Sequence, residues 1–217
     1  MRQGAKDNQP PENIKLGGRH YIGKGAFIAA ARGTRGAFFH SLLECLLKTQ
    51  ATGPVWDERI ELEDALKRME EYLRAAHKAG GKAIFIGNGG SAAIASHMAV
   101  DYSKNKGVRS IALNDAAMLT MIANDHGYEQ VFAKQIEWHG RRSDVAVIIS
   151  SSGRSLNIIA AVEMARKRNL RAVITLSGMN PHNQLRTKGD LNFYVPCTDY
   201  GLVELSHMTI LHSVASV

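Results

Sequence analysis

Glycine and serine residues gather in two short segments, each directly after an apolar run. The first is Gly87-Asn88-Gly89-Gly90-Ser91, and the second, 150–155, holds four serines in six residues. Glycine lets the backbone approach an anion closely, while serine hydroxyls and free N–H groups at a helix start donate hydrogen bonds to it. These residue types are also ordinary in turns and helix caps. Because two such segments occur in one chain, the sequence favours a binding site for a phosphate group.

Histidine and carboxylate side chains with metal-ligand spacing form a second candidate site. His97 and Asp101 stand four residues apart on a predicted helix and therefore face the same side. Zinc accepts this pair of ligands, although a surface His–Asp contact has the same spacing. Glu204 and His212 are separated by about 12 Å along a helix, so they meet one ion only by reaching toward each other or by coming from different subunits. We interpret His207, near Glu204, as a structural histidine.

Strands and helices alternate through the segments that carry these residues. We expect strands near 82–87, 109–113, 144–150, 171–176 and 191–196. We expect helices near 91–103, 116–123, 127–140, 155–168 and from 201 onward. This alternation predicts an α/β fold with a five-stranded parallel sheet and helices on both faces. Ligands of such sheets bind at the carboxyl ends of the strands, where both glycine/serine segments and Asn114-Asp115 lie.

Two further helices are predicted before the first of these strands, over 36–52 and 57–79, from apolar residues at helical spacing. As an antiparallel pair they would offer an apolar face to a neighbouring subunit, so we expect a homo-oligomer, specifically a tetramer. We divide the chain into a basic, flexible arm over 1–35 and a single domain over 36–217.

Charge and composition exclude several classes of protein. The formal net charge is +7, but 1–54 hold eight basic and three acidic residues, which leaves 19 basic and 17 acidic residues in the rest. Because the body is nearly neutral, nucleic-acid binding is not expected. No apolar run is long enough for a membrane span, and the first residues lack a signal peptide's apolar core. Cys45 and Cys197 are single and widely spaced, which fits a reducing cytoplasm.

Five segments carry a resemblance to a known family. The runs GNGGSAA, AND-x-G, SSSGRS, VITLSG and ELSHMTILH occur here in the order and spacing of a sugar isomerase (SIS) domain. Within that family the chain resembles phosphoheptose isomerases, which convert sedoheptulose 7-phosphate to D-glycero-D-manno-heptose 7-phosphate for bacterial surface polysaccharide. The resemblance covers about 36–217 and implies a three-layer fold of the flavodoxin or Rossmann kind.

The resemblance also implies roles for individual residues. It implies a phosphate-binding serine loop at Ser150, Ser151, Ser152 and Ser155. It implies a first substrate-binding turn at Asn88, Gly89, Gly90 and Ser91. It implies contacts to the open-chain sugar from Asn124, Asp125 and Glu204. Finally, it implies a zinc site and an acid/base pair, the zinc ligands being His97, Asp101, Glu204 and His212, and the catalytic pair being Asp101 and His212.

The chain departs from the family pattern at the catalytic residues. Asp101 stands where the family has glutamate, which draws the carboxylate back by one methylene, and misplacement on this scale can cost about a hundredfold in rate. Glu204 replaces a neutral glutamine, and Val100 replaces an acidic residue. The basic loop after the helix is shortened to 103–107. These departures leave the identity of the sugar open.

The leading interpretation is aldose–ketose isomerisation of a phosphorylated sugar through an enediol. Asp101 would remove the proton next to the carbonyl, His212 would move a proton between the oxygens, and zinc would polarise the carbonyl. If Asp101 binds the metal tightly it becomes a poorer base. One alternative is a noncatalytic SIS module that senses a sugar phosphate or bridges protein partners, as replication-initiator-binding relatives do. Another is an isomerase for a different sugar phosphate.

Overall fold

The computed structural model describes residues 13–16, 19–22, 35–54 and 58–216. The chain divides into two compact units, Met1–Glu44 and Cys45–Val217. In the first unit, β1 (Asn13–Leu16) and β2 (Arg19–Ile22) pair as an antiparallel hairpin, and α2 (Arg35–Leu47) begins. Most of the expected basic arm over 1–35 lies outside the described residues.

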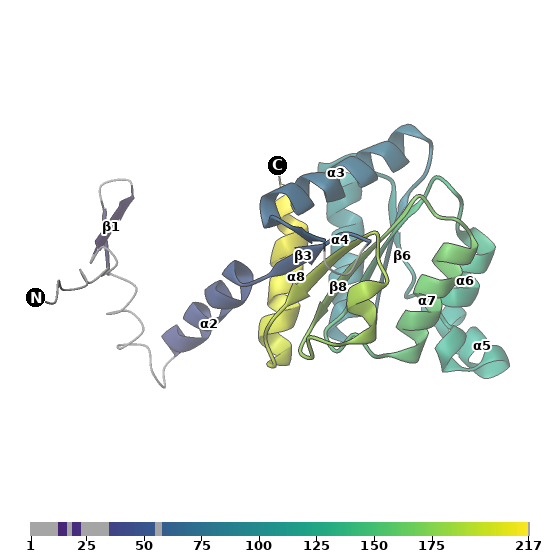
Figure 1. The fold of residues 1–217 in the computed structure, drawn as a ribbon. Coiled ribbons are helices and arrows are strands. Elements are labelled where there is room, and N and C mark those ends of the chain that lie inside the picture. The colour runs from purple at the N-terminus through teal and green to yellow at the C-terminus, as the bar shows by residue number, and fades with distance from the viewer. Residues whose placement is uncertain (1–12, 17–18, 23–34, 55–57, 217) are drawn as a thin grey trace, which may run out of the picture. The chain divides into compact units, whose positions relative to one another are not determined.

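The second unit is built on a seven-stranded sheet with the order β4-β3-β9-β8-β7-β5-β6 (Figure 1). Its five parallel strands are β5 (Ala83–Gly87), β6 (Ser110–Ala112), β7 (Val145–Ser150), β8 (Ala172–Gly178) and β9 (Leu191–Val195). All five lie where the sequence predicts them. Their order, β6-β5-β7-β8-β9, is that of flavodoxin-like folds, in which a ligand binds where the strand order reverses. In this sheet the reversal lies between β5 and β7.

Two antiparallel strands make the predicted count of five strands wrong. They are β3 (Gln50–Thr52) and β4 (Arg59–Ile60), and β3 pairs with β9 so that Ala51 lies opposite Phe193. The apolar spacing over 36–52 predicts one continuous helix. The edge of β9, however, offers unpaired backbone groups that hydrogen-bond with Gln50–Thr52, so these residues form a strand instead. The predicted N-terminal helical pair is therefore interrupted, with both strands between α2 and α3 (Leu62–Lys78).

Helices cover both faces of the sheet, as predicted. Figure 1 shows α3, α4 (Gly90–Asn105) and α8 (Tyr200–Ala215) on one side, and α5 (Ala116–His126), α6 (Ala133–His139) and α7 (Leu156–Lys167) on the other. Alternate residues of a strand point to opposite faces. In β5, Ile84 and Ile86 accordingly join the core under α5–α7, while the Phe85 ring contacts Tyr102 of α4 at a centroid distance of 5.2 Å.

Two short 3₁₀ helices complete the unit: η1 (Tyr128–Gln130) follows α5, and η2 (Gln184–Thr187) follows β8. Among the helices of the described ranges, none has the length and apolar character needed to cross a bilayer. The fold thus brings the carboxyl ends of β5 and β7 together, with α4 and α7 starting directly after them.

Candidate active site

The two glycine/serine segments lie side by side at the predicted edge of the sheet. Gly87, the last residue of β5, pairs with Ile149 of β7, so both turns begin at the same level. Asn88 Nδ2 donates to Asn157 Oδ1 at 2.9 Å, and Asn157 Nδ2 donates back to Asn88 Oδ1 at 2.9 Å. This reciprocal amide pair joins the first turn to the helix that follows the serine loop.

The backbone of the first turn requires its glycines. Gly89 precedes α4 with φ +53° and ψ −123°, a conformation that L side chains rarely adopt. A side chain at Gly87 would collide with the backbone of Ser91. The chain therefore turns directly from β5 into α4 and places the free N–H groups of the helix start at the sheet edge, where they favour an anion.

The hydroxyls of the serine loop differ in their local hydrogen bonding. Ser150 Oγ accepts from the Gly153 N–H at 3.2 Å, and Gly153 itself has φ +62°. Ser151 Oγ is buried and has no hydrogen-bond partner within the described part of the chain. Ser155 occupies the N-cap of α7, yet its side chain makes no capping hydrogen bond. Since buried polar groups in proteins are normally paired, the unpartnered Ser151 hydroxyl fits a loop that donates to a bound anion.

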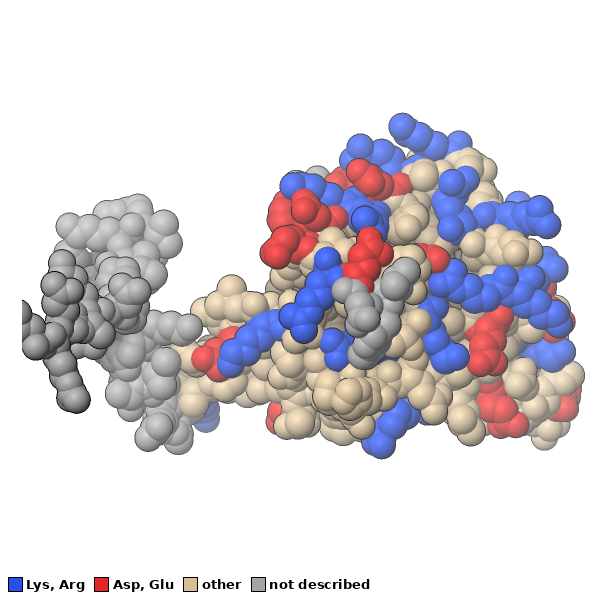
Figure 2. Space-filling model, in the orientation of Figure 1, with Lys and Arg blue, Asp and Glu red and all other residues tan. Residues whose placement is uncertain are grey.

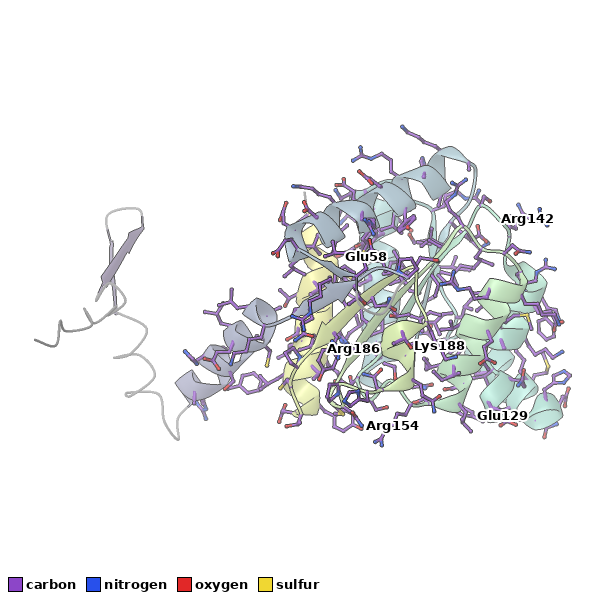
Figure 3. All side chains as sticks on the ribbon, viewed as in Figure 1. Glu58, Glu129, Arg142, Arg154, Arg186 and Lys188 are labelled. Carbon is purple, nitrogen blue, oxygen red and sulfur yellow. The ribbon has the colours of Figure 1, made fainter. Side chains whose placement is uncertain are left out.

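The serine loop is supported from behind by the segment after β8. The Leu185 N–H donates to the Gly153 carbonyl at 3.1 Å, and the Asn183 side chain fills the space where a side chain at Gly153 would lie. Asn183 Nδ2 also donates to Ser177 Oγ at 3.3 Å. Arg154, the residue of the loop that is most open to solvent, extends from the lower edge of the sheet in Figure 3.

Three of the four predicted metal ligands come together. His97 Nε2 and His212 Nδ1 each lie 3.4 Å from Asp101 Oδ2, and the two imidazole rings are 5.2 Å apart. The candidate ligand atoms all lie within 4.8 Å of one another. Two histidine nitrogens and a carboxylate are a typical catalytic zinc set, and ligands about 2.0–2.1 Å from an ion at tetrahedral angles stand about 3.3 Å apart. The donor set and its spacing therefore fit zinc.

Glu204, the fourth predicted ligand, lies elsewhere. It is not part of the cluster of His97, Asp101 and His212. Its carboxylate fills the space that a side chain at Gly90 would occupy, beside the first turn. Glu204 is eight residues before His212 on α8, so the helix places it at the phosphate end of the candidate site.

Asn124 and Asp125 lie near the end of α5, and both are exposed. Asn124 Nδ2 donates to Asp125 Oδ1 at 2.7 Å. The helix η1 that follows them reaches the first turn, where the Tyr128 hydroxyl donates to Asn88 Oδ1 at 3.4 Å. The structure thus brings this segment to the border of the site without a hydrogen bond from Asn124 or Asp125 to either turn among the described residues.

Asn157 and Tyr128 are neighbours of the site that the sequence analysis does not identify. Asn157 is only 3% exposed and is the polar residue between Leu156 and Ile158 in the apolar first turns of α7. A polar residue on the buried side of a helix is a signal that could have indicated it. No comparable pattern indicates Tyr128, because its approach to Asn88 depends on how α5 and η1 pack.

His207 packs inside the fold, which agrees with its interpretation as a structural histidine. It is fully buried, and its Nε2 lies 3.1 Å from the Ser177 carbonyl oxygen. Burial lowers the pKa of His207 to about 4, since the charged form would lose its hydration, and the contact with Ser177 only partly opposes this. His207 is thus neutral at pH 7 and ties α8 to the end of β8.

Comparison with known proteins agrees with this geometry. The SIS domain family model matches residues 55–178. The phosphoheptose isomerase of Thermodesulfovibrio yellowstonii is 39% identical over 153 residues, which are 68% of this chain and 75% of that protein. The corresponding Helicobacter pylori enzyme is 36% identical over 157 residues, or 70% and 81% of the two chains.

Solved structures give the same result. The structure of the phosphoheptose isomerase from Neisseria gonorrhoeae matches with a TM-score of 0.70 at 30% identity, over 83% of this chain and 94% of that one. The Francisella tularensis phosphoheptose isomerase matches with a TM-score of 0.71 at 27% identity, over 83% and 93%. With the paired turns, the serine loop and the sheet order in place, the chain belongs to the SIS domain family.

Proposed function

We propose that this chain isomerises sedoheptulose 7-phosphate to D-glycero-D-manno-heptose 7-phosphate. The names of its relatives support this substrate pair. The observation that carries the proposal is the cluster of His97, Asp101 and His212 in the same unit as a serine loop suited to phosphate. A module that only binds a sugar phosphate needs the loop but has no use for a carboxylate held between two imidazoles.

Phosphate binding would fix the substrate. Hydroxyls of Ser150, Ser151, Ser152 and Ser155 and the N–H groups at the start of α7 would donate to the phosphate oxygens. The Asn88–Asn157 pair holds the first turn against α7, so the two anion-binding segments keep one geometry. Glu204, beside Gly90, would meet hydroxyl groups of the sugar near this end. Asn124 and Asp125 would contact the open chain from α5.

Proton transfer would fall to Asp101 and His212. Asp101 would take the proton from carbon 1 of the ketose, leaving an enediol, and would return a proton to carbon 2 to form the aldose. His212 would carry the hydroxyl proton from the oxygen on carbon 1 to the oxygen on carbon 2, so no atom is gained or lost. His97, 3.4 Å from the same carboxylate oxygen, would hold Asp101 in position.

His97, Asp101 and His212 are the residues that would hold zinc. A bound ion would polarise the carbonyl and stabilise negative charge on the enediolate. The Asp101 carboxylate would then serve both as metal ligand and as base. These two roles oppose each other, because a carboxylate that binds a metal strongly is a weaker base. Glu204 is left for the substrate, since its carboxylate lies at the first turn and not in the cluster.

The distance along α4 supports an active site shared between subunits. Asp101 is eleven residues beyond Gly90, which is about 16 Å along the helix. The five carbon–carbon bonds between carbon 7 and carbon 2 of the sugar extend over about 6–7 Å. We therefore propose a homotetramer in which the serine loop of one copy faces the Asp101 cluster of another. Exposed apolar side chains on α2, among them Phe39 and Leu43, suit such an assembly, which light scattering would test.

The cellular setting follows from the same proposal. The two cysteines of the chain, Cys45 and Cys197, are widely spaced, which fits a reducing cytoplasm. The product would be a precursor of bacterial surface polysaccharide.

Exchange of the carbon-bound proton in heavy water tests the function directly. Purified protein is incubated with sedoheptulose 7-phosphate and a panel of ketose phosphates, with and without zinc, and exchange is followed by NMR. We expect exchange and aldose formation with sedoheptulose 7-phosphate. Exchange with another ketose phosphate alone would identify a different isomerase. Phosphate binding without exchange on any substrate would identify the noncatalytic module instead.

A further inference from the structure

A cavity lies at the amino ends of the strands, away from the serine loop. Its volume is about 410 Å³, and its main lining residues are Lys82, Arg109, Trp138, Arg141, Asp144 and Arg168. Three of these precede strands directly: Lys82 before β5, Arg109 before β6 and Asp144 before β7. In Figure 3, Arg142 at this end and Arg154 of the serine loop lie at opposite ends of the sheet.

Positive charge dominates this cavity. Lysine and arginine contribute four of its side chains, and Asp144 is the carboxylate among them. Asp144 is already satisfied, because its side chain is 1% exposed and accepts from Lys82 Nζ at 2.6 Å, the Lys82 N–H at 2.9 Å and the Arg141 N–H at 2.9 Å. Figure 2 shows lysine and arginine side chains gathered around this upper right end of the unit. The guanidinium groups therefore remain available to an anion.

Two of these guanidinium groups are held in place by the backbone. Arg109 Nη1 donates to the Gly80 carbonyl at 3.0 Å, and Arg168 Nη2 donates to the Gly140 carbonyl at 3.3 Å. A guanidinium has five N–H donors, so each keeps donors for a ligand. Fixed arginine forks suit phosphate oxygens better than mobile lysines, because less freedom is lost on binding.

Trp138 adds an apolar surface to this basic cavity. Its side chain is 45% exposed although it is the kind of residue that proteins normally cover. An indole ring beside several cations offers a stacking surface next to a polyanion site, and stacking on aromatic rings is how proteins bind bases without reading their identity. We propose that the cavity binds a nucleoside di- or triphosphate, with the phosphates on Arg109, Arg141 and Arg168 and the base on Trp138. This inference does not depend on the isomerase function.

Calorimetric titration of the full chain with ATP, tripolyphosphate and adenosine tests the proposal. ATP should bind at least about fivefold more tightly than tripolyphosphate, because the base adds stacking, and adenosine should bind most weakly. Replacing Arg141 and Arg168 together by glutamine should weaken ATP binding at least about tenfold, since each charge-assisted contact contributes substantially. Trp138→Ala should weaken ATP but leave tripolyphosphate unchanged. Raising the salt concentration should weaken both polyphosphates.

Two control variants locate the site. Lys67→Gln removes an exposed charge on α3, and Ser152→Ala alters the serine loop; both should bind ATP as the unaltered chain does. Loss of ATP binding in Ser152→Ala would place the nucleotide in the serine loop and overturn the proposal. Equal affinity for ATP and tripolyphosphate, unaffected by Trp138→Ala, would overturn it as well, as would absence of binding at millimolar ATP. If the double variant does not fold, Arg141→Gln alone, at an exposed position, provides the same test.

Discussion

Asn88 and Asn157 hydrogen-bond to each other twice, with each amide nitrogen donating to the other's oxygen at 2.9 Å. One residue lies in the turn after β5 and the other in α7, so the pair connects two elements that are 69 residues apart in sequence. Because the amides use each other as donor and acceptor, neither needs a ligand to be satisfied. The Asn88–Asn157 pair therefore holds the two candidate phosphate-binding segments together whether or not a ligand is bound.

Asn157→Ala should remove the two hydrogen bonds that hold the first turn against α7. Asn88 would lose both hydrogen bonds to Asn157 and keep the longer one from the Tyr128 hydroxyl, with a cost of about 1–3 kcal/mol in the free energy of unfolding. The first turn would also lose its fixed position, so KM for sedoheptulose 7-phosphate should rise more than kcat falls. Denaturant unfolding and steady-state kinetics measure the two effects. Asn105→Ala, at the exposed end of α4, is the matched control, and a KM equal in both variants would contradict the role of Asn157.

Ser152→Ala should weaken substrate binding. Removing a hydroxyl that donates to a charged phosphate oxygen costs about 1–3 kcal/mol, which is about a five- to 150-fold rise in the dissociation constant. Calorimetry with the substrate measures this change, and circular dichroism checks the fold. Ser103→Ala on α4 serves as the control. Unchanged affinity in a folded Ser152→Ala variant would remove Ser152 from the phosphate site.

Asp101 and His212 should act as one unit. Asp101→Asn should abolish proton exchange but leave phosphate binding largely intact, since the carboxylate acts on carbon and the serines on phosphate. His212→Ala should also reduce turnover severely, and the double variant should be little worse than either single one. NMR in heavy water and single-turnover kinetics provide the readouts. Asp101→Glu restores the residue usual in the family and should maintain or raise activity.

Metal binding should depend on three residues and not on a fourth. His97→Ala and His212→Ala should each reduce bound zinc, because each removes one nitrogen ligand from the cluster. Glu204→Gln should retain zinc but change the affinity for the sugar, since Glu204 lies at the first turn. Equilibrium dialysis with elemental analysis measures zinc per chain. Zinc lost from Glu204→Gln and kept in His97→Ala would reverse the assignment.

His207 should make stability depend on pH. Burial lowers its folded-state pKa to about 4, against about 6.5 in the unfolded chain. Above pH 6.5 this residue is neutral in both states; as the pH falls from 6.5 to 4, only the unfolded state takes up the proton. The free energy of unfolding should therefore drop by about 3 kcal/mol across that range. His207→Gln, which can still donate to the Ser177 carbonyl, should lose this component, whereas parallel pH curves for both proteins would refute it.

The sequence was sufficient to predict the five parallel strands and the two turns. Runs such as Val145–Ile149 are apolar throughout, which is typical of strands buried on both faces, and glycine marks where each strand ends. The strands β3 and β4 were missed because they are short and because β3 forms by pairing with β9, a contact distant in sequence, while β4 forms by pairing with β3. The spacing of apolar residues along a short segment does not show that the segment will pair with a distant edge strand.

In the candidate site, too, the sequence predicts local arrangements but not those that depend on packing between distant elements. His97 and Asp101 could be paired from their spacing on one helix, because helical geometry alone brings them together. His212 joins them through the packing of α4 against α8, for which the family resemblance was the only guide. That resemblance also grouped Glu204 with the metal ligands, whereas its place beside Gly90 depends on the register of α8 against the first turn.

The length of α4 has a genetic consequence for a cell that expresses two different inactive variants of this chain. Asp101 lies eleven residues along α4 from the first turn, the turn beside which the serine loop lies, and a composite site would take the loop from one copy and the cluster from another. A chain altered at Ser152 and a chain altered at Asp101 would each be inactive by itself. In mixed assemblies some sites would combine the intact loop of one chain with the intact cluster of the other. Two null alleles would then complement each other.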